Sequence, residues 1–365
     1  MKNFIKKILL LAALTIIGLG LFVFFPCYYI DTFNIFHIFD LRFTSAEPNK
    51  NFTKTKYILS DKEKFNAFLL GSSKVGYLPD DYLPKEMDGK ALNWYNMTYS
   101  EGVPKENYLT LKTFIENGID VKAAVVTFDS IAMYATYEEH AQQFLRIPYQ
   151  EYEKDPFAYY AKYLYTFPDI TIINQVLSYS KEKNKDVKET YYTKGTSISL
   201  YDITIDESAP VDLAKYNSAP IKYTAKDAYK DIIDLKNFCD ENNIKLTLAT
   251  NPLYITNYKE SVAAGYLDFL EKISEHCNFY CFSGLSKYST DPHYFYEKIH
   301  FKVYVGNEMT KVLFGSEEEK LEAQKKAALS KEDEDLFGIL VTKDNFKEIK
   351  ERLLEQYNYP DKFTY

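Results

Sequence analysis

The chain has 365 residues, enough to bury a full hydrophobic core in one large domain or in a domain with additions. Its net charge is -8 and no stretch concentrates Lys and Arg on one face, so we expect no nucleic acid partner. Aromatic residues make up 17% of the chain, with 34 Tyr and 26 Phe. That content suits a surface that stacks on sugars, but an AT-rich genome gives the same composition and is the explanation we favour.

Four cysteines are spread along the chain: Cys27, Cys239, Cys277 and Cys281. None lies in a CxxC motif and no histidine cluster has metal-ligand spacing, so we expect no metal site, and nothing calls for an organic cofactor. Cys277 and Cys281 are too far apart for a mutual disulfide if their segment is a strand. A bridge from Cys239 to either of them stays open, although we favour unpaired buried thiols.

An uncharged apolar run covers residues 8–25 and follows three lysines, the last of them Lys7. A helix needs roughly 20 apolar residues to cross a bilayer, and tilt makes up a small shortfall. A cleaved signal peptide is the alternative, but the run lacks the small residues of a cleavage site. We therefore predict a single-pass transmembrane anchor within residues 1–27, with its N-terminus in the cytoplasm and the globular domain extracytoplasmic. Residues 28–60 are expected to form an aromatic and polar stalk.

After the stalk, short apolar runs alternate with amphipathic helical patterns. Strands are expected at 68–70, 91–95, 123–128, 245–250 and 279–282. Helices are expected at 104–117, 224–239, 262–273 and 303–313. This alternation predicts βαβ units, and hence an α/β domain with a mostly parallel sheet over residues 61–315.

Two segments break the alternation. Residues 131–222 are crowded with tyrosine, and we interpret them as a helical insertion over the C-terminal edge of the sheet, where substrate walls lie. Beyond Gly315 the sequence becomes charged, with a last amphipathic pattern that includes Phe346 and Ile349. We expect residues 316–365 to be a solvated helical extension rather than part of the catalytic core.

A candidate nucleophile follows the first predicted strand, which ends in Gly71-Ser72-Ser73. Ligands bind at the C-terminal edge of the strands in parallel α/β sheets, so Ser73 is placed where a substrate would arrive. A serine hydroxyl needs a base, usually a histidine oriented by a carboxylate. Of five histidines, His300 stands just before the last helix of the α/β region and three residues after Glu297. Each motif alone is more often a turn or a surface pair, but together they predict a Ser-His-acid triad.

The order of these residues resembles the SGNH, or GDSL, hydrolase superfamily. Its first block corresponds to Gly71-Ser72-Ser73, its second to the loop ending at Gly102, and its Asp-x-x-His block to Glu297-Lys298-Ile299-His300. The pattern is most similar to the membrane-anchored branch that contains the D-alanyl-lipoteichoic-acid transfer protein and related envelope acyl-transfer proteins. The resemblance implies a three-layer α/β/α sandwich and an oxyanion hole made by the N–H groups of Ser73 and Gly102.

The sequence departs from the family pattern at two blocks. Glu297 stands where the family has Asp, so Asp291 stays open as the acid. Phe128-Asp129-Ser130 stands where the family has its third block, Gly-x-Asn-Asp. Asn251, after the fourth predicted strand, is a substitute oxyanion donor by location alone.

We therefore expect a serine acyl-esterase or O-acyltransferase that acts on a cell-envelope polysaccharide or a teichoic-acid-like polymer. Substrate would contact the insertion at 131–222. The resemblance to the transfer proteins also implies a membrane-bound O-acyltransferase as a partner. The alternative is a catalytically degenerate protein of the same fold that binds envelope glycan or scaffolds an acyl-export complex.

Overall fold

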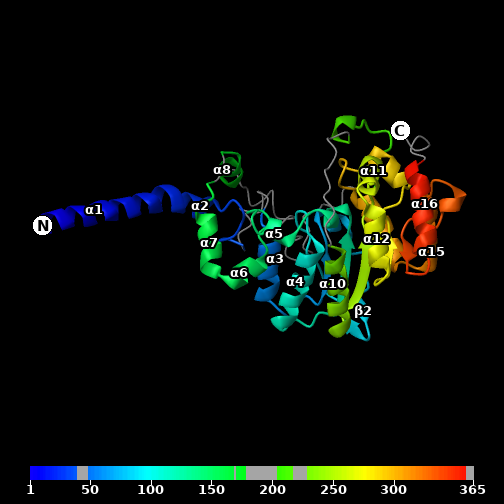
Figure 1. Cartoon of the computed structure of the whole chain (residues 1–365), viewed down its shortest axis with the longest axis horizontal. Coiled ribbons are helices and arrows are strands. Elements are labelled where there is room, and N and C mark those ends of the chain that lie inside the picture. The colour runs from blue at the N-terminus through cyan, green and yellow to red at the C-terminus, as the bar shows by residue number, and fades with distance from the viewer. Residues whose placement is uncertain (39–47, 168–169, 178–203, 217–227, 359–365) are drawn as a thin grey trace. The chain divides into compact units, whose positions relative to one another are not determined.

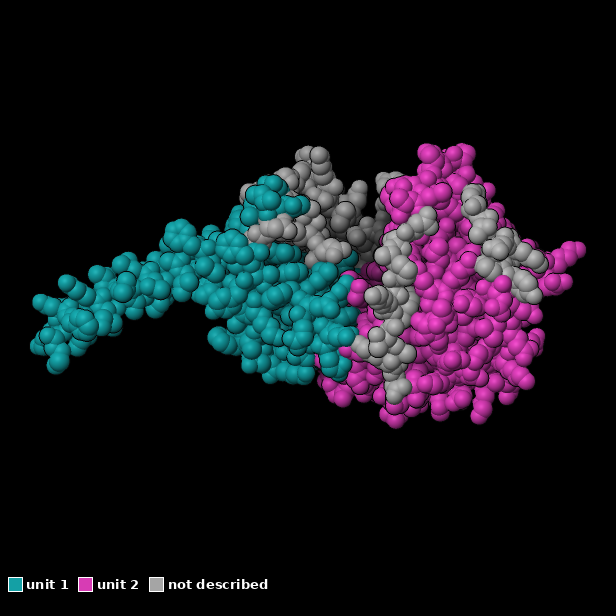
Figure 2. All heavy atoms as spheres, turned by 45° about the horizontal axis from the view of Figure 1, so that its top comes forward, with its two compact units in different colours: residues 1–61, 138–189 teal, residues 62–137, 190–365 magenta. Residues whose placement is uncertain are grey.

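A computed structural model of the chain describes residues 1–38, 48–167, 170–177, 204–216 and 228–358 (Figure 1). The chain divides into two compact units, coloured separately in Figure 2. Unit 1 consists of residues 1–61 and 138–189, and unit 2 of residues 62–137 and 190–365.

Unit 1 begins with one continuous helix from Lys2 to Ile30, formed by α1 (Lys2–Leu19), the π-helical η1 (Gly20–Phe24) and α2 (Phe25–Ile30). It is long and apolar enough to cross a membrane, and its apolar window is not buried against the rest of the chain. The helix ends at Asp31, whose carboxylate accepts the backbone N–H groups of Ile35 (2.7 Å) and His37 (2.8 Å). An apolar helix at these residues was expected from the sequence.

The rest of unit 1 is a small helical body. Its helices are α3 (Lys50–Ser60), α6 (Tyr149–Lys154), α7 (Pro156–Leu164) and α8 (Ile170–Leu177). Its core contains Ile35, Phe52, Ile147, Tyr149, Tyr159 and Tyr163. Phe52 stacks on Tyr159 with ring centroids 4.8 Å apart, and the Asn49 side chain donates to the Ile147 carbonyl at 2.8 Å.

This core differs from the predicted organisation. Residues 28–60 were expected to be a stalk and 131–222 a single insertion, yet the whole of the first range and residues 138–189 of the second belong to unit 1. The reason is that the aromatic side chains of both segments bury apolar area against each other, which neither segment could do alone.

Unit 2 is built on a six-stranded sheet in the order β4-β1-β5-β6-β7-β8. The strands are β1 (Ala67–Leu70), β4 (Trp94–Asn96), β5 (Ala123–Phe128), β6 (Lys245–Thr250), β7 (Phe279–Cys281) and β8 (Ile339–Val341). The first five are parallel, and β8 pairs antiparallel with β7. A short separate hairpin joins β2 (Glu86–Met87) to β3 (Lys90–Ala91).

The parallel strands therefore run 2-1-3-4-5 in chain order, an arrangement common in doubly wound α/β folds. Every residue of β1 and of β5 is buried, as expected for central strands covered on both faces. In this order the chain switches direction between β1 and β5, and ligands bind outside the carboxyl ends of strands at such a point. Ser73 follows β1 and Asp129 follows β5, so both lie at this switch point.

Helices cover the sheet of unit 2. Among the described residues they are α4 (Pro104–Glu116), α10 (Tyr229–Glu241), α11 (Ile255–Ala263), α12 (Tyr266–Ser274), α13 (Lys287–Thr290), α14 (Val303–Phe314), α15 (Glu317–Ala327) and α16 (Phe346–Asn358). The short helix α5 (Tyr137–His140) lies where the chain passes from unit 2 into unit 1. Helix α10 packs against both α4 and α12 (Figure 1). The helix predicted at 262–273 is divided, because Gly265 between α11 and α12 has a left-handed backbone (φ 95°).

The C-terminal segment also differs from the prediction. Residues 316–365 were expected to be a solvated extension, but β8 is the sixth strand of the sheet and α16 buries Phe346, Ile349 and Leu353. The run Ile339-Leu340-Val341 is too short for its periodicity to separate a strand from a loop, so only pairing with β7 defines it.

All four cysteines are free and buried, which confirms the favoured expectation of unpaired thiols. Burial raises the pKa of the Cys239 thiol to about 12 and that of the Cys277 thiol to about 11. Thiols held in this form are poor nucleophiles.

Candidate active site

The turn that carries Ser73 is shaped by Gly71, the residue directly after β1. Its backbone has φ 149°, and a Cβ at this position would lie 2.7 Å from the carbonyl oxygen of Thr127 on β5. Only glycine allows the chain to pass so close to the neighbouring strand. The chain then enters the 3₁₀ turn η3 (Ser73–Tyr77), with the Ser73 side chain half-buried at the start of this turn.

Ser72 has a structural part in the same turn. Its side chain is buried and its hydroxyl accepts the backbone N–H of Lys74 at 3.4 Å. This capping contact shows that Ser72 shapes the turn, while the neighbouring Ser73 presents its hydroxyl to His300.

His300 lies on a tight hairpin-like loop between α13 and α14. Phe295 and Phe301 form an isolated antiparallel bridge, and the Tyr296 N–H donates to the His300 carbonyl at 2.9 Å. Glu297 is in the bend of this loop, where its carboxylate accepts the backbone N–H groups of Ile299 (2.8 Å) and His300 (3.0 Å). The longer Glu side chain thus folds back onto its own loop, which holds the carboxylate in place.

The structure brings the three predicted triad residues together. Ser73 Oγ lies 2.7 Å from Nε2 of His300, and Nδ1 of the same ring contacts Oε1 of Glu297. The carboxylate assigns the ring proton to Nδ1, which leaves the lone pair of Nε2 free to accept the serine proton. The side chains of His300 and Glu297 are 29% and 32% exposed, so solvent reaches the site.

The electrostatic state of Glu297 suits an orienting group. Burial favours its neutral form, but hydrogen bonds from the His300 ring and from the Ile299 and His300 backbone outweigh burial and lower its pKa. The carboxylate is therefore ionised near neutral pH, where it can stabilise a positive charge on His300.

The alternative acid, Asp291, is engaged elsewhere. Its carboxylate lies 2.7 Å from Nδ1 of His293 and also accepts the His293 backbone N–H at 2.9 Å. Nε2 of His293 lies 2.9 Å from the carbonyl of Ala209, so this second His-Asp pair is structural. Burial lowers the pKa of His293, but the hydrogen bonds to Asp291 and Ala209 outweigh burial and raise it.

Gly102, the predicted second oxyanion donor, lies against the nucleophile turn. A Cβ on Gly102 would stand 2.2 Å from the carbonyl oxygen of Gly71. Within the described part of the chain, neither the Gly102 N–H nor the Ser73 N–H donates a hydrogen bond to another residue. Both N–H groups are therefore available to donate a hydrogen bond to an incoming oxygen atom.

Asn251 follows β6 as expected, and its side chain is fully buried. Its amide nitrogen donates to Oδ2 of Asp129 at 2.9 Å, while its side-chain oxygen is buried and has no partner among the residues that the structure describes. The structure thus joins Asn251 to Asp129 and shows no contact between Asn251 and the triad.

A buried ion pair lies directly behind the nucleophile, and sequence reasoning missed it. Nζ of Lys74, the residue after Ser73, lies 2.9 Å from Oδ2 of Asp129, and both side chains are 1% exposed. Burial raises the pKa of Asp129, but the positive charge of Lys74 and hydrogen bonds from Ile131 and Asn251 outweigh burial and lower it. The pair joins the end of β1 to the end of β5 at the switch point.

The last part of the predicted insertion supports the histidine loop. The Tyr216 hydroxyl lies 2.8 Å from the Phe295 carbonyl and 3.0 Å from the Pro292 carbonyl. On the other side of the loop, Lys298 is almost fully buried and forms an ion pair with Glu260 at 2.7 Å. No local sequence signal pointed to Tyr216 or Glu260, since both act across long stretches of chain. The role of residues 131–222 as a substrate wall stays a prediction, and 178–203 and 217–222 lie outside the described residues.

No protein-family model matches the chain, and no curated protein matches its sequence.

Proposed function

We propose that the protein is a membrane-anchored serine acyl-esterase or O-acyltransferase of the SGNH type. The observation that carries the proposal is the continuous hydrogen-bonded series from Ser73 Oγ through the His300 ring to the Glu297 carboxylate. A base in contact with the hydroxyl and an orienter in contact with the base are the arrangement that nucleophilic catalysis requires. Its place at the switch point of a parallel sheet supports the same proposal, as does the order of serine and histidine along the chain.

In the first half of the reaction, the Ser73 oxygen attacks the carbonyl carbon of an acyl ester while Nε2 of His300 takes the hydroxyl proton. The negative oxygen of the tetrahedral intermediate accepts the N–H groups of Ser73 and Gly102, each worth about 3 kcal/mol in the transition state. Glu297 stabilises the imidazolium. His300 then gives its proton to the departing alcohol oxygen, and the acyl group stays on Ser73 as an ester.

In the second half, His300 takes a proton from a new hydroxyl, and that oxygen attacks the acyl-enzyme. The Ser73 oxygen departs and recovers the proton from His300, which restores the free enzyme. If the second hydroxyl belongs to water, the protein is an esterase; if it belongs to a polymer, the protein is a transferase.

We further propose that the helix from Lys2 to Ile30 spans the membrane and places unit 2 outside the cell. An acyl group on an envelope polysaccharide or a teichoic-acid-like polymer would then be within reach. The transfer version calls for a membrane-bound O-acyltransferase that delivers acyl groups across the bilayer. The fold proposed for unit 2 is the three-layer α/β/α sandwich of the superfamily.

A second candidate is a catalytically degenerate protein that binds envelope glycan or scaffolds an export complex. The bond from Asn251 to Asp129 favours it, because this amide is held away from the triad and the family's third block is absent. Reactivity of Ser73 separates the two candidates.

The test is labelling of the full-length protein with a fluorophosphonate probe in detergent. Wild type and Ser72→Ala should label, while Ser73→Ala and His300→Ala should not. Ser72→Ala is the matched control because it removes the adjacent hydroxyl and leaves the triad intact. Equal labelling of wild type and Ser73→Ala, together with no turnover of p-nitrophenyl acetate, would leave only the non-catalytic candidate.

A second experiment separates hydrolysis from transfer. The enzyme is given p-nitrophenyl acetate with and without a polyol-phosphate polymer, and the acetyl group is followed by mass spectrometry. Transfer predicts acetylated polymer at the expense of acetate, whereas an esterase gives acetate in both mixtures.

A further inference from the structure

Unit 1 carries an exposed apolar patch that its own core leaves uncovered. Of the large hydrophobic side chains described beyond residue 30, four are the most exposed: Phe157 (85%), Ile170 (69%), Tyr165 (67%) and Phe167 (61%). They all lie within fourteen positions of one another, on α7, at the start of α8 and between these helices. We call these four residues the α7–α8 patch.

Helix α7 is apolar on two opposite sides. Tyr159 and Tyr163 are buried in the core of unit 1. Phe157 and Leu164 lie seven positions apart and therefore share another face of the helix, which Tyr165 extends. Lys162 is the single charged residue among the nine of α7. A surface helix of a soluble body is expected to be polar on its outer side, so this composition indicates an apolar neighbour.

The patch is continuous with the apolar N-terminal helix. Phe24, near the end of the uncharged run at 8–25, makes an edge-to-face contact with Tyr165 at a centroid distance of 5.2 Å. Helix α2 packs against both α7 and α8. If the N-terminal helix spans a bilayer, Tyr165 is thus held at the depth where the hydrocarbon ends, the level at which Tyr and other aromatic side chains concentrate.

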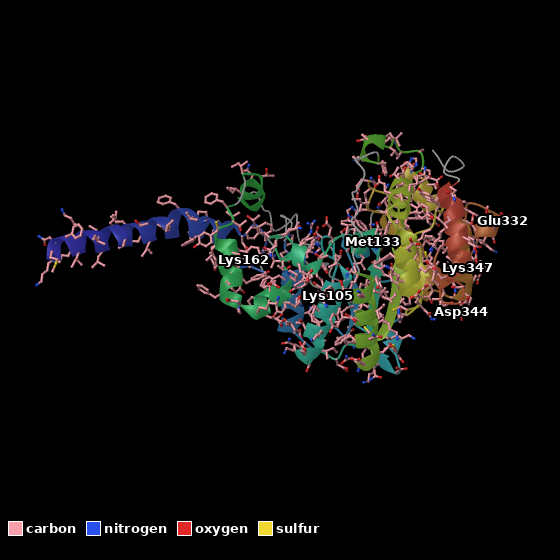
Figure 3. The ribbon with its side chains drawn as sticks, in the orientation of Figure 1. Lys105, Met133, Lys162, Glu332, Asp344 and Lys347 are labelled. Carbon is pink, nitrogen blue, oxygen red and sulfur yellow. The ribbon has the colours of Figure 1, made fainter. Side chains whose placement is uncertain are left out.

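The direction of α7 suits the same surface. Figure 1 shows α7 running across the direction of α1, beside α2. The nine residues of α7 extend about 13 Å, so a helix parallel to α1 would carry Phe157 far from the depth of Tyr165. Because α7 runs crosswise, both ends of the patch can lie at one depth. Lys162, labelled in Figure 3, is exposed and could extend its ammonium to lipid phosphates.

From these observations we propose that the α7–α8 patch is seated in the interfacial layer of the lipid bilayer, at the outer end of the N-terminal helix. Unit 1 then contacts the membrane in two ways: its N-terminal helix crosses the bilayer, and its α7–α8 patch lies in the interfacial layer. The inference rests on the transmembrane span proposed above and is independent of the chemistry proposed for Ser73.

The test uses site-directed spin labels on the full-length protein in nanodiscs that contain one copy of the chain and a mixture of neutral and anionic phospholipids. All four native cysteines are buried, so a label goes to an introduced exposed cysteine. Labels are placed by Phe157→Cys and Phe167→Cys, in separate variants. Leu14→Cys within α1 controls for the span, and Leu321→Cys, exposed on α15, controls for solvent. The wild-type protein, treated with the same spin-label reagent, shows how much label the four native cysteines take up.

Collision rates with oxygen, which dissolves in lipid, and with a polar nickel chelate, which does not, report the surroundings of each label. The proposal predicts an oxygen-to-nickel ratio at Phe157→Cys and Phe167→Cys that is clearly higher than at Leu321→Cys and lower than at Leu14→Cys. If the patch labels match Leu321→Cys while Leu14→Cys reports lipid, the span stands and the patch proposal is overturned. If Leu14→Cys also reports water, the span itself fails and the patch proposal falls with it. A patch label shielded from both reagents indicates a protein occupant and also overturns the proposal.

Discussion

The carboxylate of Glu297 contacts Nδ1 of His300 and accepts the backbone N–H of the same residue at 3.0 Å. One carboxylate therefore fixes both the ring and the main chain of the base. An Asp side chain is shorter by about 1.5 Å, one carbon–carbon bond, and would retract from this position. The arrangement explains how Glu can occupy the position where the SGNH pattern has Asp.

The first prediction concerns that carboxylate. Glu297→Gln should lower kcat of ester hydrolysis by about 10²–10⁴-fold, because a neutral amide no longer stabilises the imidazolium or selects its tautomer. Glu297→Asp should be intermediate, since it keeps the charge and loses reach. Both variants should melt as cooperatively as wild type. Full activity in Glu297→Gln would remove Glu297 from the mechanism, and Asp291→Asn then identifies the alternative acid.

The second prediction concerns the buried pair behind the nucleophile. Lys74→Met leaves the Asp129 carboxylate buried without its cation, and should cost about 3–5 kcal/mol in the free energy of unfolding. The double variant Lys74→Met/Asp129→Asn has no unpaired buried charge. Its loss in the free energy of unfolding should therefore be well below the sum of the losses in the two single variants. Urea unfolding of all four proteins measures the coupling. Additive costs would mean that the two side chains do not stabilise each other.

The third prediction follows from the lowered pKa of Asp129, whose ordinary value is 3.8. A carboxyl group with a lower pKa in the folded state stabilises the fold above its unfolded value, and that contribution is lost as the pH falls through the folded value. Wild-type stability should therefore fall as the pH drops below about 4. Asp129→Asn should be less stable at neutral pH but show a shallower loss in acid. An identical acid slope in both proteins would assign the loss to other carboxyl groups.

The fourth prediction concerns the contact between Gly102 and Gly71. Gly102→Ala places a Cβ 2.2 Å from the Gly71 carbonyl oxygen, so the nucleophile turn must shift. We expect a loss of about 1–3 kcal/mol in stability from overpacking, together with a fall in kcat that is larger than the fall in kcat of a well-folded control variant. Gly265→Ala is that control, because its Cβ meets open space and its cost of about 1 kcal/mol is backbone strain alone. Equal effects of the two substitutions on kcat would show that the close contact between Gly102 and Gly71 is not needed to position Ser73.

Some features of this protein follow from local sequence alone. Strand β5 is an almost wholly apolar run, and β6 combines Leu246 and Leu248 with β-branched threonines before the turn at Asn251-Pro252, so both are evident without any partner. The uncharged run at 8–25 predicts an apolar helix by its length and composition alone. Glu297 and His300 are three residues apart, and a tight bend suffices to bring their side chains together.

Other features depend on residues that are distant in sequence, and only the tertiary structure decides them. Strand β8 exists because β7 offers it hydrogen bonds, and the core of unit 1 exists because two separate segments bury their aromatic rings together. The ion pair of Lys74 and Asp129 joins positions 55 residues apart, and the contact between Ser73 and His300 joins positions 227 apart. Periodicity and propensity describe what a segment can form by itself, whereas these contacts arise from the order in which the strands assemble. The pairing of β1 with β5 brings Lys74 and Asp129 together, and the fold of the chain beyond β7 brings the histidine loop to the serine turn.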